Sequence, residues 1–290
     1  MNAVEPPVDS YQPSARRLAR ERARRRATLR STLIALASTA ACFLLLAGAL
    51  VGSPGWPRVR ERFLDPNAFA EAFPKVLDGF WLNIKVFLIA EPLVLVVALA
   101  LALLRSLRGP VFAPLRLLAV GYVDLFRGLP VILVLYVVGF GLPGLQLRGV
   151  PSDPVVLGVI ALTLTYSAYV AEVFRAGIES VHPSQWAAAR ALGLGQWQTT
   201  RHVVLPQAVR RVTPPLLNDF VSLQKDTALV ATLGPLEALR QAQVYGAAVF
   251  DYTAYFAAAL LFTLLTVPTT RLTDWLAART ARRRGPGNGR

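Results

Sequence analysis

The sequence predicts an all-α integral membrane protein with about six transmembrane helices. Apolar residues make up 54% of the chain, and they gather in repeated runs of about 20 residues, the length that crosses a bilayer. Arginines flank these runs, with eight between Arg16 and Arg30 and four between Arg279 and Arg284. Because positive residues beside transmembrane spans stay in the cytoplasm, this pattern places both termini there.

The net charge of +14 would suggest a nucleic-acid partner in a soluble protein. Here the positive charge borders apolar spans and lacks interleaved aromatic residues, so the bilayer is the expected partner and nucleic acid is not. The single cysteine, Cys42, lies in an apolar run, which rules out a disulfide within the chain and a thiolate metal site. No metal site is expected.

The N-terminal part is expected to add a helix to the membrane core. Residues 1–30 form a basic cytoplasmic tail, in which residues 1–15 have the composition of a disordered lead and the rest that of a surface helix. Residues 31–52 form an uncharged run that predicts an extra transmembrane helix. A cleavable signal is the alternative, but the charged lead is long and no small-x-small site precedes Pro54. Residues 52–79 read as an external stretch of balanced charge.

Five further spans are expected. Four are apolar runs, and Gly128 and Pro130 should bend the second of them; the runs cover residues 80–104, 118–142, 155–174 and 251–270. Residues 207–233 are polar, but parity requires a crossing there, so this span should be shielded from lipid. The pair Pro214 and Pro215 should break it near its inner end. Residues 276–290 complete the chain as a basic cytoplasmic tail.

A polar segment at residues 183–205, the coupling segment, lies between two of these spans. Pro183 suits a first helical turn, and good helix formers follow it. Gly193 and Gly195 should end this helix in the left-handed conformation, and a second short helix should stop before Pro206. Small alanines beside Trp186 and Trp197 indicate a docking surface, because small residues allow close approach and tryptophan anchors interfaces.

Four motifs now indicate a family. Residues 187–189 (Ala-Ala-Ala), Gly193 and residues 203–206 (Val-Val-Leu-Pro) resemble the Glu-Ala-Ala coupling motif of ATP-binding-cassette importer permeases. Residues 126–130, 168–175 and 225–229 resemble the Phe-Arg-Gly-Thr-Pro, Ala-Tyr-x-Ala-Glu-x-Phe-Arg and Lys-Asp-Thr-Ser-Leu motifs of the polar amino acid branch. The resemblance covers residues 80–275, a permease core that typically has five spans.

The resemblance implies a permease subunit in the bacterial inner membrane. Its partners would be an ATPase subunit that binds ATP and Mg²⁺, a second permease copy or paralogue, and an extracytoplasmic solute-binding protein. The substrate would be a polar amino acid of the His/Glu/Gln/Arg/opine type or a related zwitterion, and this chain itself would hold no cofactor. The residues expected to couple to the ATPase are Ser184, Gln185, Trp186, Ala187, Ala188, Ala189, Gly193, Val203, Leu205 and Pro206.

This chain departs from the family motifs at several positions. Ala187 stands where the coupling motif usually has Glu, which removes a charge that would pair with the ATPase; Ser184, Leu129 and Ala228 also differ from the usual Gly, Thr and Ser. Either shape supplies the coupling or the second permease of a heterodimer carries the acid. The substrate and the choice between homodimer and heterodimer stay open.

Ten residues are candidates for the substrate pathway: Glu91, Asp124, Arg127, Tyr166, Tyr169, Glu172, Asp219, Lys225, Asp226 and Thr227. Tyr166, Tyr169 and Glu172 recur at three-residue spacing, which puts them on one helix stripe.

Three of these assignments have structural alternatives. Glu91 either serves the pathway or bonds a donor freed at Pro92. Asp124 and Arg127 either contact substrate or neutralise each other. The Lys225–Asp226 pair either meets the two charges of a zwitterion or braces a helix.

Enzymatic chemistry is not expected in this chain. The two histidines, His182 and His202, have no nearby carboxylate or cysteine partners for nucleophilic catalysis or metal binding, and no phosphate-binding glycine loop is present. ATP hydrolysis therefore requires a separate subunit. Two alternatives are a proton-driven secondary transporter that uses Glu91 and Glu172, and a noncatalytic scaffold that recruits a cytosolic partner through the coupling segment.

Overall fold

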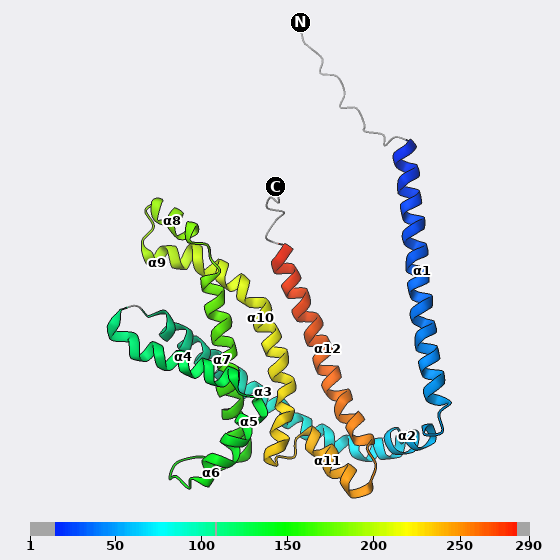
Figure 1. Ribbon diagram of the computed structural model, residues 1–290. Coiled ribbons are helices and arrows are strands. Elements are labelled where there is room, and N and C mark those ends of the chain that lie inside the picture. The colour runs from blue at the N-terminus through cyan, green and yellow to red at the C-terminus, as the bar shows by residue number, and fades with distance from the viewer. Residues whose placement is uncertain (1–14, 108, 283–290) are drawn as a thin grey trace. The chain divides into compact units, whose positions relative to one another are not determined.

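The computed structural model describes residues 15–107 and 109–282, and the described chain is helical (Figure 1). Parts of both expected tails, residues 1–14 and 283–290, lie outside the described residues. The chain divides into two compact units at Arg60 and Glu61. The first unit contains α1 (Ala15–Val51) and the start of α2 (Trp56–Phe63).

The second unit contains the remaining helices. They are α3 (Pro66–Ser106), η1 (Pro110–Phe112), α4 (Ala113–Gly128), α5 (Val131–Tyr136), η2 (Val137–Gly141), α6 (Leu142–Gly144), α7 (Pro154–Glu179), α8 (Pro183–Ala191), α9 (Gln196–Thr199), η3 (Thr200–Val204), α10 (Leu205–Asp226), η4 (Thr227–Leu233), α11 (Ala238–Val249) and α12 (Thr253–Arg282). In this unit α8 and α9 lie at one end of α7, and α6 lies near its other end (Figure 1).

Four described helical stretches are long and apolar enough to cross a membrane: Ala27–Val51, Trp56–Ser106, Pro154–Glu179 and Thr253–Arg279. A fifth candidate is the bent pair Pro110–Gly128 and Val131–Gly144, whose parts meet at 108°. The predicted bend at Gly128 and Pro130 is confirmed, because Pro130 forces Leu129 into an extended conformation between α4 and α5. The sixth expected span corresponds to α10, which is too polar to qualify by composition.

The stretch at residues 52–79, expected to be external, is largely helical: α2 and the first turns of α3 occupy most of it, so α3 begins well before the span start expected at residue 80. Asp65 caps α3 by accepting a hydrogen bond from the Asn67 amide at 2.8 Å, and Pro66 begins the first turn. Ala68, Ala72 and Val76 then bury one stripe against α11 and α12. This spacing of four residues is the helical signal that the charged residues between them concealed.

The main core of the second unit lies where α3, α4, α5, α7, α10 and η4 meet. Leu135, Leu157, Leu162 and Leu223 are fully buried there, and α3 and α7 form its central pair. The polar helix α10 packs between α7 and α12, which shields much of it from lipid. Helix α10 also continues through Pro214 and Pro215, so the expected break is wrong. Contacts of Val212 with Gly177 of α7 support the helix just before the two prolines.

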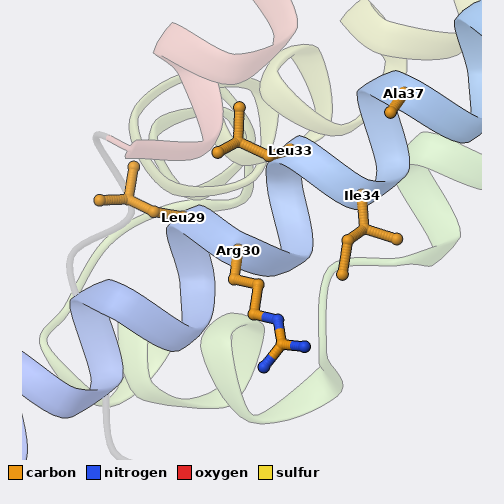
Figure 2. A pocket seen from close by; sticks show the side chains of 5 residues that line it. All are labelled: Leu29, Arg30, Leu33, Ile34 and Ala37. Atoms are coloured by element: carbon orange, nitrogen blue, oxygen red, sulfur yellow. The ribbon is translucent and has the colours of Figure 1, made fainter.

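Helix α1 presents apolar side chains outward. Figure 2 shows Leu29, Arg30, Leu33, Ile34 and Ala37 on successive turns of this helix, around a shallow hollow that α1 alone lines. A hollow lined by one face of a single helix encloses no ligand, so it is not a candidate binding site.

Candidate coupling segment and polar pathway

The first coupling helix, α8, is fixed at its start by His182 and Pro183. The His182 ring nitrogen Nδ1 accepts a hydrogen bond from the Ser184 amide at 3.2 Å, and Pro183 occupies the first turn, as the sequence predicts. Ser184, Gln185, Ala187 and Ala188 are exposed on the helix, and only Ala189 is buried. Helix α8 therefore presents a small-residue face to the solvent.

Gly193 ends α8 in the left-handed conformation, with φ +81°. The Leu194 amide donates to the Ala189 carbonyl at 3.2 Å, and the Gly193 amide donates to the Arg190 carbonyl at 2.9 Å, which together form a Schellman motif. The same expectation for Gly195 is wrong, because its φ is −64° and it serves instead as the residue before α9. One left-handed residue suffices for the corner, because Gly195 is the extended N-cap residue from which α9 starts.

The two tryptophans of this segment have different surroundings. Trp186 is half-buried and packs against Val181, Val204 and Ala208 of its own chain. Trp197 is 71% exposed, and Leu192 at the corner is 82% exposed. Trp186 therefore holds α8 on its scaffold, whereas Trp197 is free to meet a partner. The sequence did not distinguish these roles.

The second coupling helix does not stop before Pro206, contrary to the sequence-based expectation. Helix α9 widens into the π-helical turn η3 and continues directly into α10. A wider turn accommodates the missing amide of Pro206, because the ladder of hydrogen bonds shifts register just before the proline. Val203 is half-buried in η3, and Leu205 and Pro206 are exposed. The coupling segment is therefore continuous with α10, so a force applied to α9 would be transmitted to α10.

Three pathway candidates, Glu91, Asp219 and Asp226, make up a set of acids that we call the acidic cluster: Glu91 of α3 and Asp219 of α10 approach each other, and Asp226 lies about two turns farther along α10 and faces α7. The Glu91 and Asp219 carboxylates lie near enough to repel each other, and the buried Asp219 Oδ2 has no hydrogen-bond partner. The Tyr166 hydroxyl of α7 donates to Asp226 Oδ2 at 2.8 Å. Within the described ranges no arginine or lysine forms an ion pair with these carboxylates. An unsatisfied buried carboxylate favours a ligand that carries a cationic donor.

Tyr169 extends this arrangement toward α4. Its ring centroid lies 6.3 Å from that of Tyr166, and its hydroxyl donates to the Arg127 carbonyl at 3.4 Å. Tyr166 thus connects α7 to α10, and Tyr169 connects α7 to α4.

Lys225 and Asp226 point in different directions and form no pair with each other. Lys225 is exposed and lines a cavity with Phe262, Thr263 and Thr266 of α12, whereas Asp226 faces Tyr166 of α7. Adjacent helical residues diverge by about 100°, which explains the separation. The two side chains therefore do not brace the helix as a pair, and contact of either with a zwitterion stays a prediction.

Glu172 lies in an ionic cluster at the end of α7 nearest α8. It pairs with Arg105 of α3 at 3.0 Å, with Arg127 of α4 at 4.0 Å and with Arg175, which also pairs with Glu179. Asp124 is exposed and does not pair with Arg127 among the described residues. The expected Asp124–Arg127 pair is wrong, because Arg127 instead approaches the carboxylate of Glu172 on the neighbouring helix.

A buried network near α11 includes two residues that sequence reasoning missed. Asn83 Nδ2 donates to Glu237 Oε2 at 2.9 Å and to the Thr227 hydroxyl at 3.3 Å, and Asn83 Oδ1 accepts from the Ala238 amide at 3.1 Å. Glu237 is fully buried, and burial raises the pKa of its carboxyl. The sequence offered a signal for each residue. Asn83 is an amide within an apolar span, and Glu237 is an acid just ahead of a helix, where its carboxylate accepts a hydrogen bond from the Arg240 amide at 2.6 Å.

Close backbone contact makes this network possible. A Cβ atom at Gly79 would lie 2.6 Å from the Glu237 carbonyl carbon, so only glycine lets α3 pass the start of α11 at this distance. The Asn83 network thus joins α3, η4 and α11, and Thr227 has a structural role within it.

Comparison with known proteins now identifies the family. Residues 95–282 match the family described as binding-protein-dependent transport system inner membrane component. The chain is 36% identical over 210 residues to the probable glutamine ABC transporter permease protein GlnM of Bacillus subtilis, covering 71% of this chain and 94% of that protein. It is 34% identical to the arginine transport system permease protein ArtQ of the same organism, covering 65% of this chain and 84% of that protein.

Solved structures support the same fold. A crystal structure of an amino acid ABC transporter with histidines superposes with a TM-score of 0.68 at 29% identity, covering 74% of this chain and 98% of that chain. An inward-facing MetNI methionine ABC transporter matches the fold with a TM-score of 0.58 at 18% identity, covering 71% of this chain and 95% of that chain. In this family the ATPase is a separate protein. The chain therefore belongs to the binding-protein-dependent transport system inner membrane components, the multi-pass permease subunits of ATP-binding-cassette importers.

Proposed function

We propose that this chain is the permease subunit of an importer for polar amino acids or related zwitterions, and that residues 183–205 receive the force of a separate ATPase. The observation that carries the proposal is the coupling segment itself: an exposed small-residue helix, a rigid glycine corner and a seated Trp186. A stiff projection transmits displacement, whereas a flexible loop would absorb it.

The proposed partners follow from this arrangement and from the relatives. The ATPase subunit binds ATP and Mg²⁺ and docks on α8 and α9. A second permease, either a copy or a paralogue, completes the pathway, and a solute-binding protein delivers substrate from outside. Both termini lie in the cytoplasm, as the flanking arginines indicate.

Ala187 gives the docking surface its character. Where related coupling motifs have a glutamate, this chain has an exposed alanine, so α8 offers no charge at that position. The fit to the ATPase therefore depends on shape and on the exposed Leu192 and Trp197. In a heterodimer, the second permease would supply the acidic residue.

The acidic cluster sets the charge preference of the pathway. The acidic cluster offers the substrate three carboxylates, those of Glu91, Asp219 and Asp226. None of them has a basic partner among the described residues, and Asp219 Oδ2 is buried without a hydrogen bond. A substrate ammonium or guanidinium group satisfies this need through a charge-assisted hydrogen bond. Glu172, in contrast, is held by arginines, which argues against its use as a mobile proton carrier.

The test is uptake into proteoliposomes that contain the permease, its ATPase and its binding protein. We expect accumulation that requires ATP on the ATPase side and survives an uncoupler. Accumulation that collapses with the uncoupler and ignores ATP would identify the proton-driven alternative. Solute that never accumulates with any candidate partner would support the scaffold alternative.

A substitution tests the acidic cluster within the same assay. Asp219→Asn should reduce uptake at least tenfold, because it removes the charge that a cationic group meets, at about 1.4 kcal/mol per factor of ten. Asp274→Asn, at an exposed position on α12, is the matched control and should leave uptake unchanged. Equal uptake by both variants would remove Asp219 from the pathway.

A further inference from the structure

We propose that the cavity between the ends of α3, α4 and α7 binds the headgroup of an anionic phospholipid. Its volume is about 590 Å³, and the last turns of α3 and α7 and the first turns of α4 line it. The lining side chains are Ala102, Arg105, Ser106, Ala113, Arg116, Leu117, Val120, Arg175, Ile178 and Glu179. None of these residues belongs to the coupling segment or to the candidates for the substrate pathway.

The charge of the cavity suits an anion. Arg105 and Arg175 already have carboxylate partners in Glu172 and Glu179. Arg116 differs, because its Nη1 donates only to the Leu107 backbone carbonyl at 3.0 Å, and no ion pair of Arg116 exists within the described ranges. The half-buried Arg116 guanidinium therefore retains donors and a full positive charge toward the cavity. Arginine recognises a phosphate diester well, because the planar, forked donors of its guanidinium group match the phosphate oxygens.

The surroundings of Arg116 favour a lipid over a free ion. Leu117 is 71% exposed and Ile178 is 43% exposed, so apolar surface continues outward from the cavity. Val111 of η1, just before α4, is 82% exposed. A membrane protein surface that has arginines beside outward-facing apolar side chains matches the boundary between headgroups and acyl chains. Basic cavities between transmembrane helices on the cytoplasmic side are known to take anionic headgroups.

The expected complex has a simple geometry. The phosphate lies against Arg116, with Arg105 and Arg175 beside it, and an acyl chain follows Leu117 and Ile178. Helices α3, α4 and α7 would then be tied together by one lipid at the end where α7 leads to the coupling segment.

The experiment measures lipid retained by the full chain purified with its ATPase. Phosphatidylglycerol and phosphatidylcholine with identical acyl chains are added in equal amounts, and bound lipid is counted by native mass spectrometry. We expect the wild type to retain phosphatidylglycerol preferentially. Arg116→Gln should lower that retention about fivefold, the effect of one basic contact, and Arg116→Lys should restore part of it.

The controls separate a lipid site from general charge and from misfolding. Arg271→Gln removes an exposed arginine from α12 and should retain lipid as the wild type does. Val120→Phe fills the cavity while leaving every charge in place, and it should also lower retention. Melting temperatures of all variants report folding, so Val120→Phe tests the proposal even if Arg116→Gln is unstable.

Several results would overturn the proposal. Equal retention of the two lipids by the wild type, or equal retention by the Arg116→Gln and Arg271→Gln variants, would rule out a specific site. Displacement of phosphatidylglycerol by millimolar inorganic phosphate would assign the cavity to a free anion. Retention by the isolated chain that disappears in the complex with the ATPase would assign this face to a subunit contact.

Discussion

Gly193 is the residue on which the corner of the coupling segment depends. With φ at +81°, any L side chain at this position adopts a conformation that costs about 1–2 kcal/mol, and a β-branched one costs more. The space around a Cβ at Gly193 is open, so a substitution strains the backbone without a steric clash. The effect of a mutation here is therefore conformational.

Gly193→Val should abolish ATP-driven uptake while leaving membrane insertion intact, because the corner between α8 and α9 is displaced. Proteoliposome uptake and the yield of inserted protein measure the two effects. Gly195→Ala is the matched control, since Gly195 has φ −64° and a Cβ there meets only Gln198 Oε1 at 3.6 Å. Normal uptake by the Gly193→Val variant would refute the corner geometry.

Glu237 makes stability depend on pH. Burial raises the folded-state pKa of its carboxyl above the ordinary value of 4.5, so the folded chain binds this proton more tightly than the unfolded chain does. Its stabilising contribution is full below pH 4.5 and is lost as the pH rises through the raised folded-state pKa.

The melting temperature of the purified chain should accordingly fall as the pH rises above 4.5, and Glu237→Gln should flatten that dependence. Asp78→Asn, which removes an exposed acid nearby on α3, should leave the slope unchanged. A slope that persists in the Glu237→Gln variant would assign the pH dependence to other groups.

At the residue level, sequence patterns identified side chains more readily than their partners. The spacing of Tyr166, Tyr169 and Glu172 correctly put them on one face, but nothing local revealed that Arg105, 67 positions earlier, would pair with Glu172. Asn83 and Glu237 were missed for the same reason, because their bond joins residues 154 positions apart. Contacts between distant segments depend on helix packing, which spacing does not encode.

At the scale of elements, the coupling segment combines a half-buried tryptophan with an exposed one. Trp186 packs against Val181, Val204 and Ala208, and Trp197 is 71% exposed on α9. Trp186→Ala should lower the melting temperature, because truncating a half-buried tryptophan removes roughly 1–3 kcal/mol of apolar contact.

Trp197→Ala should keep the wild-type melting temperature and instead weaken binding of the ATPase by roughly 30-fold, as expected when an interface tryptophan worth about 2 kcal/mol is lost. Binding of the ATPase to the permease in nanodiscs measures this difference. The opposite pattern, with stability lost at Trp197 and binding lost only at Trp186, would reverse the assigned roles.

Helix boundaries could be predicted where a local sequence signal sets them. The predictions failed where packing against other helices determines whether a helix continues. Pro130 set the bend between α4 and α5, and Pro183 with Gly193 set the limits of α8. Proline signals at Pro206, Pro214 and Pro215 failed, because a π-helical turn and contacts with α7 keep α10 continuous. Charges at residues 71–78 concealed the first turns of α3, whose buried stripe is visible only once α11 and α12 are in place.

For the whole molecule, the arrangement connects an exposed coupling segment directly to the acidic cluster. Helix α10 follows directly after the turn η3 and ends at Asp226, so a displacement of α9 that is carried along this helix would move both Asp219 and Asp226. Shifting a two-state equilibrium from 1:99 to 99:1 takes about 5.5 kcal/mol of differential binding, which the proposed closure of an ATPase around ATP would have to supply. The continuous helix makes this coupling mechanical.

The all-helical membrane fold was predictable because hydrophobic length and arginine placement are physical properties of the chain itself. The span through residues 207–233 came from parity alone, and α10 lies there with its polar groups packed between α7 and α12. The acidic cluster could be predicted only as separate residues, since Glu91 and Asp219 meet through the packing of α3 and α10.

The most direct test of the account is photo-crosslinking from the coupling segment in the assembled importer. A photoreactive amino acid in place of Ala188, which is exposed on α8, should crosslink to the ATPase subunit, and the same group in place of Leu147 between α6 and α7 should not. No ATPase crosslink from Ala188 in a complex that transports substrate would contradict the claim that residues 183–205 receive the force of ATP hydrolysis.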